Sequence, residues 1–154
     1  MANSFKQIYV HVIFAVKGRQ SLLKNEHREE LHKYMTGIVK ERECKLVAIN
    51  SVSDHLHLML AYNPKVVLAD VIRDLKAFSS KMMNERGWFE REFHWQNGYG
   101  AFSVSPSQAD TVVRYIANQE EHHRKKTFRE EFVEFLKNSG IEFDPKYLFD
   151  PIEE

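Results

Sequence analysis

The stretch SVSDHLHLMLAY, residues 51–62, places two histidines inside an otherwise apolar run. Successive side chains of a strand point to opposite faces, so His55 and His57 share one face. The opposite face carries the apolar side chains Leu56, Leu58 and Leu60. The stretch therefore predicts a strand with one face in a core and the other face displaying two imidazoles.

The rest of the chain places this strand in the centre of a sheet. Periodicity and composition predict the following elements in chain order: strand 7–16, helix 25–43, strands 44–54 and 55–62, helix 67–85, strand 101–105, and helices 105–125 and 127–138. This order matches the split βαβ pattern. We therefore expect an α+β, ferredoxin-like sandwich, an antiparallel sheet with helices on one face plus C-terminal helices. In that topology the histidine strand is central, and its second face is open.

Short motifs predict where three of the helices begin. Asn25 is suited to cap the first helix. Ser105 is expected to be an N-cap, with Pro106 at the first helical position and Gln108 closing a capping box. Thr127 opens another capping box, so a C-terminal helix should begin there.

Composition limits the class of protein. The chain has 154 residues, with 22 basic and 22 acidic side chains, which suits one globular domain of zero net charge. Zero net charge excludes a protein that coats nucleic acid through bulk charge, but not a local basic groove. The single cysteine, Cys44, excludes an internal disulfide and a Cys-rich zinc site. The start MANSFKQIYV lacks a signal-peptide core, and no apolar run is long enough to span a bilayer, so we expect a soluble cytoplasmic protein.

Tyr115 and Gln119 can act together with the histidine pair. They lie at i and i+4 on the helix 105–125, at the edge of its apolar face. A bare H-x-H pair is more often ligand-free, and Tyr115 and Gln119 alone would be ordinary boundary residues. Together, however, two imidazoles and an amide oxygen suit a divalent cation, and a phenol beside such a cation can attack a phosphodiester. Such ligands should bind Mn²⁺ more tightly than Mg²⁺, although Mg²⁺ is more abundant in cells.

These residues carry a family resemblance. HLHLML resembles the HUH motif (His, bulky hydrophobic, His), and YIANQ resembles the Tyr-x-x-x-Gln helix of the single-tyrosine HUH transposases of the insertion-sequence 200/605 group. Further similar stretches are YVHVIFAVKGRQ, VIRDLKAFSSKMM, WQNGYGAFSVS and GIEFDPKYLFD. The resemblance covers nearly the whole chain. It implies a transposase domain over residues 1–125, and a C-terminal helix and tail, 126–154, packed on the same domain.

The resemblance also implies a chemistry. Tyr115 would be the nucleophile that nicks single-stranded DNA, forming a 5′-phosphotyrosine and freeing a 3′-OH that is later rejoined. His55, His57 and Gln119 would hold Mg²⁺ or Mn²⁺, and no nucleotide cofactor is needed. The DNA would be marked by hairpins at the ends of a mobile element. The protein would be a homodimer in which the tyrosine helix of one subunit can complete the site of the other.

Other residues have two interpretations each. Asp54 either orients an imidazole or serves a turn, and His11 either supports the pair from the first strand or merely packs. Candidate DNA contacts in the first basic turn and on the second helix are Lys17, Arg19, Arg73, Lys76, Ser79, Ser80 and Lys81. An ordinary solvated helix face would look the same. The aromatic segment WFEREFHWQNGYG either stacks on unpaired bases or packs as a small core under a loop.

Three alternatives to a mobile-element transposase remain open at this point. A domesticated relative would act on repeated chromosomal hairpins, which only the genomic distribution of such hairpins would reveal. A non-catalytic module binding single-stranded DNA or RNA would use the open sheet face, would ignore added metal and would tolerate Tyr115→Phe. A structural dimerisation domain would neither bind metal nor cut DNA.

Overall fold

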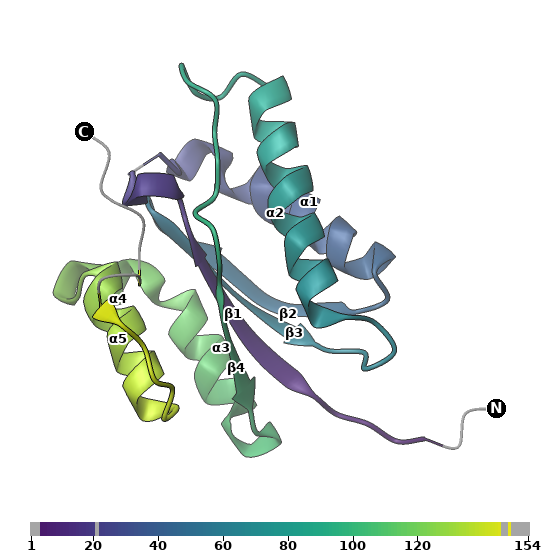
Figure 1. Ribbon diagram of the computed structural model, residues 1–154. Coiled ribbons are helices and arrows are strands. Elements are labelled where there is room, and N and C mark those ends of the chain that lie inside the picture. The colour runs from purple at the N-terminus through teal and green to yellow at the C-terminus, as the bar shows by residue number, and fades with distance from the viewer. Residues whose placement is uncertain (1–3, 21, 146–147, 149–154) are drawn as a thin grey trace.

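The computed structural model describes residues 4–20, 22–145 and 148 (Figure 1). Its strands are β1 (Tyr9–Ala15), β2 (Lys45–Ser51), β3 (His55–Ala61) and β4 (Gly100–Val104). Its helices are α1 (Asn25–Glu41), α2 (Leu68–Glu85), α3 (Ala109–Ala117), α4 (Gln119–Lys125) and α5 (Phe128–Asn138), with 3-10 turns η1 (Lys17–Arg19) and η2 (Pro106–Gln108). Within the described ranges, no helix combines the length and the apolar character needed to cross a bilayer.

The sheet confirms the predicted topology. Its strand order is β2-β3-β1-β4, and all neighbouring pairs are antiparallel. The histidine strand β3 is therefore central. Its register on β1 sets Ile13 opposite His57 and Ala15 opposite His55, so the side chains of these two pairs lie on the same sheet face.

The core fills the other face of the sheet, beneath α1 and α2 (Figure 1). Leu56, Leu58 and Leu60 are fully buried there, as the alternating pattern of β3 predicts. Met35 of α1 and Leu75 of α2 belong to the same buried cluster. Burying a leucine side chain contributes about 1.5–3 kcal/mol, so these positions hold the histidine strand in place.

The histidine face is not open, and this expectation from the sequence is wrong. Figure 1 shows α3 and α5 on the side of the sheet opposite α1 and α2. Helix α5 presents a stripe of large apolar residues at spacings of three and four, Phe128, Phe132, Phe135 and Leu136. This stripe packs with Ile13, Ala15 and Phe102 of the sheet into a second apolar cluster. As a result, His55 and His57 are buried, at 1% and 0% exposure.

The helix starts are only partly as predicted. The expected helix 105–125 is divided into η2, α3 and α4, with a break at Asn118, whose φ and ψ are −98° and 24°. Asparagine favours such breaks because its side chain competes for backbone hydrogen bonds. Ser105 and Asn25 make no capping bond, and Asn25 is already the first helical residue. Thr127 does cap α5, accepting from the backbone N–H of Glu130.

Gly100 begins β4 and lies against the aromatic rings of Phe102 and of Phe132 from α5. A Cβ at this position would lie 2.6 Å from Phe132 Cε2 and 2.9 Å from Phe102 Cε2. We expect Gly100→Ala to lower the free energy of unfolding by about 1–3 kcal/mol, because both rings must move. Urea denaturation measures this change, with Gly37→Ala as control. A Cβ at Gly37, inside α1, meets nothing within 4 Å, so that variant should be about 0.5–1 kcal/mol more stable. Equal stability of Gly100→Ala and the wild type would contradict this packing.

Candidate active site

Six side chains from four elements and one turn converge beneath α5. His11 comes from β1, His55 and His57 from β3, and Asp54 from the turn before β3. Tyr115 comes from the last turn of α3, and Gln119 opens α4. The break at Asn118 puts the two residues on separate helices, yet Gln119 Nε2 still lies 3.4 Å from the carbonyl oxygen of Tyr115.

Both metal-candidate histidines are oriented through Nδ1. Nδ1 of His55 lies 2.7 Å from Oδ1 of Asp54, and Nδ1 of His57 lies 2.9 Å from Nε2 of His11. Asp54 and His11 are the two residues that the sequence offered for this purpose. With each Nδ1 occupied, the Nε2 atoms of His55 and His57 are the ones that face the centre of the site.

Glu131 occupies that centre, and sequence reasoning missed it. Its Oε1 lies 2.7 Å from Nε2 of His57 and 3.5 Å from Nε2 of His55. The chain did hold a signal: Glu131 falls three residues after Phe128 and four before Phe135, on the apolar stripe of α5. A carboxylate is almost never buried without a partner, so an acid on a buried stripe indicates one.

Tyr115 reaches the same carboxylate from the other side. Its hydroxyl donates a hydrogen bond to Oε2 of Glu131, and its ring centroid lies 5.8 Å from that of His57. The ring of His122 packs on Tyr115 at 4.5 Å between centroids. The tyrosine and the histidine pair therefore meet within one chain.

Burial and the carboxylate together set the charges of the site. Burial lowers the pKa of His57 to about 4 despite Glu131, and burial together with His57 lowers the pKa of His11 to about 3. Burial also opposes the charge on His55, but hydrogen bonds to Asp54 and Glu131 outweigh it and raise the pKa of His55. Burial disfavours ionised Glu131, yet hydrogen bonds with His55 and His57 bring its pKa below the usual range. Burial and then Glu131 raise the pKa of the Tyr115 phenol.

The donor set fits a divalent cation. A carboxylate only accepts, so His55 donates Nδ1–H to Asp54, and in the neutral imidazole the Nε2 lone pair then faces an oxygen of Glu131. Two acceptors that face each other need a proton or a cation between them. Ligand atoms of His55, His57 and Glu131 all lie within 4.8 Å of one another. Oε1 of Gln119 is also buried, and it has no hydrogen-bond partner among the described residues.

A cavity of about 300 Å³ gives access to Tyr115 and Glu131. It lies between α4 and α5, and Lys125 and Lys126 line it. Both lysines are exposed, and Lys126 pairs with Glu134 on α5. The approach to the tyrosine is therefore lined by charges of both signs, because Glu131 and Glu134 stand beside the two lysines.

A model of the transposase IS200-like family matches residues 4–119. The chain belongs to this family. This transposase is 25% identical over 120 residues to the ISDra2 transposase TnpA of Deinococcus radiodurans, covering 73% of this chain and 84% of the relative. It is 26% identical over 120 residues to the transposase for insertion sequence element IS200 of Salmonella typhimurium, covering 74% of this chain and 78% of the relative.

Solved structures agree with this assignment. A crystal structure of a Deinococcus radiodurans transposase aligns with a TM-score of 0.61 at 25% identity, covering 77% of this chain and 95% of the other. A REP-associated tyrosine transposase bound to a REP hairpin aligns with a TM-score of 0.58 at 13% identity, covering 80% and 74%, which shows a shared fold. The family match contains His55, His57, Tyr115 and Gln119. Glu131 lies beyond it.

The candidate DNA contacts of the transposase are mostly on α2, on the sheet face opposite Tyr115 (Figure 1). Ser79 is not one of them: it is fully buried, and its hydroxyl accepts from Nε1 of Trp95. Lys76 donates to the carbonyl oxygens of Gln96 and Gly98, at 2.6 and 2.8 Å, so it also fixes the segment before β4.

Four of the other candidates, Lys17, Arg73, Ser80 and Lys81, lie at or near the surface. Lys17 and Lys81 are exposed. Arg73 is exposed as well, but it pairs with Asp70 and Asp74. Ser80 is half-buried, and its hydroxyl donates to the carbonyl of Ala77. The side chain of Arg19 lies outside the described part of the chain.

Proposed function

We propose that the protein cleaves and rejoins single-stranded DNA at hairpin-marked sites through a 5′-phosphotyrosine on Tyr115, with the help of a bound divalent cation. Membership of a transposase family supports the DNA-cleaving and rejoining activity. One observation carries the finer statement: the Tyr115 hydroxyl and the Nε2 atoms of His55 and His57 all meet the carboxylate of Glu131. The proposed nucleophile and the two proposed nitrogen ligands thus contact the same carboxylate.

The chain offers nitrogen and oxygen ligands for Mg²⁺ or Mn²⁺. His55 and His57 would bind through Nε2, and Gln119 and Glu131 would bind through Oε1. When bound, the cation would act as a Lewis acid that polarises the scissile phosphodiester. The second oxygen of Glu131 accepts the hydrogen bond of Tyr115, so the same carboxylate would hold the tyrosine hydroxyl close to the ligands of the cation.

The reaction follows from the contacts of Tyr115. Its hydroxyl gives a proton to Oε2 of Glu131 as the phenolic oxygen attacks phosphorus. The bond between phosphorus and the 3′ oxygen breaks, and the freed oxygen takes a proton from water. The hydroxide left by that water takes the proton from Glu131, whose low pKa favours its release, so the carboxylate is restored. Attack by a 3′-OH reverses these steps and rejoins the strand. The phosphotyrosine keeps the energy of the phosphodiester, so no nucleotide cofactor is consumed.

A homodimer belongs to the same proposal. β2 and β4 are the outer strands of the sheet, and an outer strand can pair with a second copy of the chain. Tyr115 meets His57 within one chain, so a dimer is not needed to bring the tyrosine helix to the histidines. Whether the DNA hairpins mark a mobile element or are dispersed in the chromosome does not alter this chemistry.

The test is covalent capture of DNA by the wild-type protein. Single-stranded oligonucleotides from both strands flanking the gene, including every hairpin, are incubated with the protein in Mn²⁺ or in EDTA. We expect a denaturation-resistant band of protein plus DNA in Mn²⁺ and none in EDTA, because the phosphodiester needs the Lewis acid. Hairpin binding that is equal in both buffers, with no adduct in either, would contradict the proposal and favour a non-catalytic binding module.

A further inference from the structure

Asn50 of β2 contacts the end of the helix that carries Tyr115. Its Nδ2 donates to the carbonyl oxygens of Ile116 and Ala117, at 3.0 and 3.2 Å. These carbonyls belong to the last turn of α3, and the last carbonyls of a helix need partners from outside it. Asn50 therefore caps α3 from a neighbouring strand, at the two residues that directly follow Tyr115.

The carboxamide of Asn50 is itself fixed in orientation. Its Oδ1 accepts from the backbone N–H of Ser51 at 2.9 Å, so Nδ2 is the group that faces α3. Ser51 is fully buried, and its hydroxyl lies 2.9 Å from Nε2 of His32 on α1. In the register of the sheet Asn50 lies opposite His57, so both side chains are on the same face. The end of α3 is thus fixed relative to the strand that bears the histidines.

The break between α3 and α4 gives this contact its importance. One continuous helix would fix Tyr115 relative to the amide ligand through its own backbone hydrogen bonds, but the two residues lie on separate helices. Beyond the break, Arg28 of α1 pairs with Glu120 of α4 at 2.5 Å. The two helices therefore have separate contacts with the rest of the domain, and that of Asn50 is on the tyrosine side.

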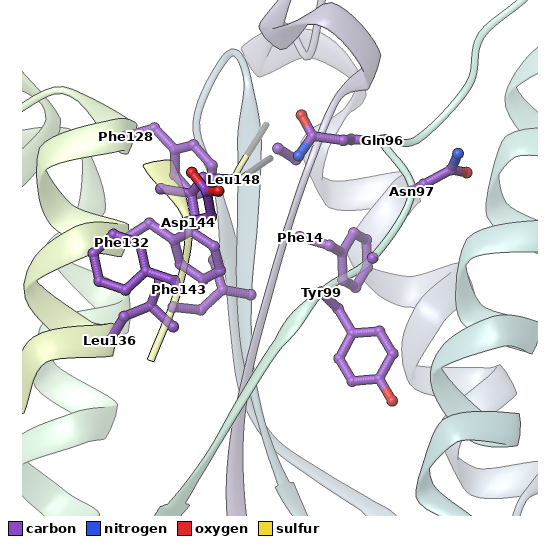
Figure 2. Close-up of a pocket in the computed structure, with 13 residues that line it drawn as sticks. Phe14, Gln96, Asn97, Tyr99, Phe128, Phe132, Leu136, Phe143, Asp144 and Leu148 are labelled. Atoms are coloured by element: carbon purple, nitrogen blue, oxygen red, sulfur yellow. The ribbon is translucent and has the colours of Figure 1, made fainter. Parts of the chain in front are cut away.

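Helix α5, which carries Glu131, is held by other contacts. Figure 2 shows Phe128, Phe132 and Leu136 of α5 beside a cavity of about 320 Å³, which the segment 96–99 also lines. The described residues around this cavity include none from β2 or α3. A substitution of Asn50 should therefore leave Glu131 in place and act on α3 alone.

We propose that Asn50 is a positioning residue for the tyrosine nucleophile. It holds the backbone that follows Tyr115, so that the phenolic oxygen is correctly placed for attack on phosphorus. It acts through the carbonyls of α3 and not through the DNA or the cation. A misplacement of about 1 Å can reduce a reaction rate by about 100-fold. The inference rests on the proposed function, since it takes Tyr115 as the nucleophile.

Asn50→Asp tests this role, because it keeps the shape of the side chain but replaces the donor with an oxygen that repels both carbonyls. We expect the single-turnover rate of adduct formation, at saturating hairpin oligonucleotide in Mn²⁺, to fall about tenfold or more. The half-saturating oligonucleotide concentration and the Mn²⁺ affinity should change by less than about threefold. A merely structural role would instead weaken binding together with the rate.

Asn63→Asp is the matched control. Asn63 also donates from Nδ2 to a backbone carbonyl, that of Glu43, and accepts from the backbone N–H of Lys65. It follows the end of β3 that is farther from His55, so its variant should form the adduct at the wild-type rate. Asn50→Ala removes the donor without adding a charge. It should also slow the adduct, and it covers the case that Asn50→Asp fails to fold.

Fluorine NMR of protein that contains 3-fluorotyrosine tests the contact without DNA. The signal of Tyr115 is the one that Tyr115→Phe lacks. We expect it to shift or broaden in Asn50→Asp and to stay unchanged in Asn63→Asp. An unchanged signal in Asn50→Asp, or an adduct formed at the wild-type rate, would overturn the inference. A wild type that forms no adduct would reject the proposed function, and the fluorine signal alone would then decide whether Asn50 positions Tyr115.

Discussion

Tyr115→Phe will form no covalent adduct with DNA under conditions in which the wild type does. The substitution keeps the ring that packs beside His57 and His122 and removes only the oxygen that would attack phosphorus. A general base or a metal ligand can often be replaced in part by water, but a nucleophile that becomes bonded to the product cannot. The expected change is therefore complete loss of the adduct band, which denaturing electrophoresis of a labelled oligonucleotide measures.

Two controls separate chemistry from folding in this experiment. Tyr34→Phe removes a hydroxyl from an exposed tyrosine of α1, and it should form the adduct at the wild-type level. Tyr115→Phe itself should still bind the hairpin oligonucleotide, since the hydroxyl serves the reaction and not the phosphate contacts. An adduct that persists in Tyr115→Phe would assign the nucleophile to another residue and would remove the central claim of the proposed function.

Glu131→Gln should weaken Mn²⁺ binding by about 100-fold. The substitution keeps the shape of the side chain but removes the negative charge that faces Nε2 of both His55 and His57. A neutral amide is the poorer ligand for a divalent cation, and the two imidazoles supply no charge of their own. Titration of the metal-free protein with Mn²⁺, following the free ion by electron paramagnetic resonance, gives the affinity without any turnover.

Glu134→Gln is the matched control for this measurement. Glu134 lies on the same helix, but it pairs with Lys126 at the surface, so its variant should bind Mn²⁺ like the wild type. His55→Ala should lose binding, because it removes a nitrogen ligand. If Glu131→Gln binds Mn²⁺ equally well or more tightly, then Glu131 only occupies the place of the cation and is not a ligand. The sign of the change thus decides between the two roles.

The sheet and the histidine strand were predictable because their signals are local. Alternation along β3 assigns Leu56 and His57 to opposite faces whatever packs on either side, and the order of elements then makes β3 central. Tyr115 and Gln119 were recognised for the same reason, as a short motif. The break at Asn118 does not separate these two residues, because Nε2 of Gln119 still lies 3.4 Å from the carbonyl oxygen of Tyr115.

The parts that were missed depend on a long-range contact. The sequence of α5 does not by itself determine which surface its aromatic stripe will cover. The histidine face was therefore expected to be open. Glu131 belongs to that same packing event: it is a site residue only because α5 docks above β3. The burial of Ser79 also depends on a contact between distant residues. Its hydroxyl accepts a hydrogen bond from Nε1 of Trp95, which lies beyond an irregular loop.

The placement of Glu131 on α5 has a consequence for the timing of activity during synthesis. Ribosomes extend a chain from its N-terminus, and folding of the earlier segments can begin before the later ones exist. The sheet, both histidines and Tyr115 all precede α5 in the chain. A nascent chain that ends before Glu131 would hold its nucleophile beside hydrated imidazoles, with neither the carboxylate nor the aromatic cover. The order of translation would thereby delay the nicking of DNA until residues well beyond the nucleophile have been made.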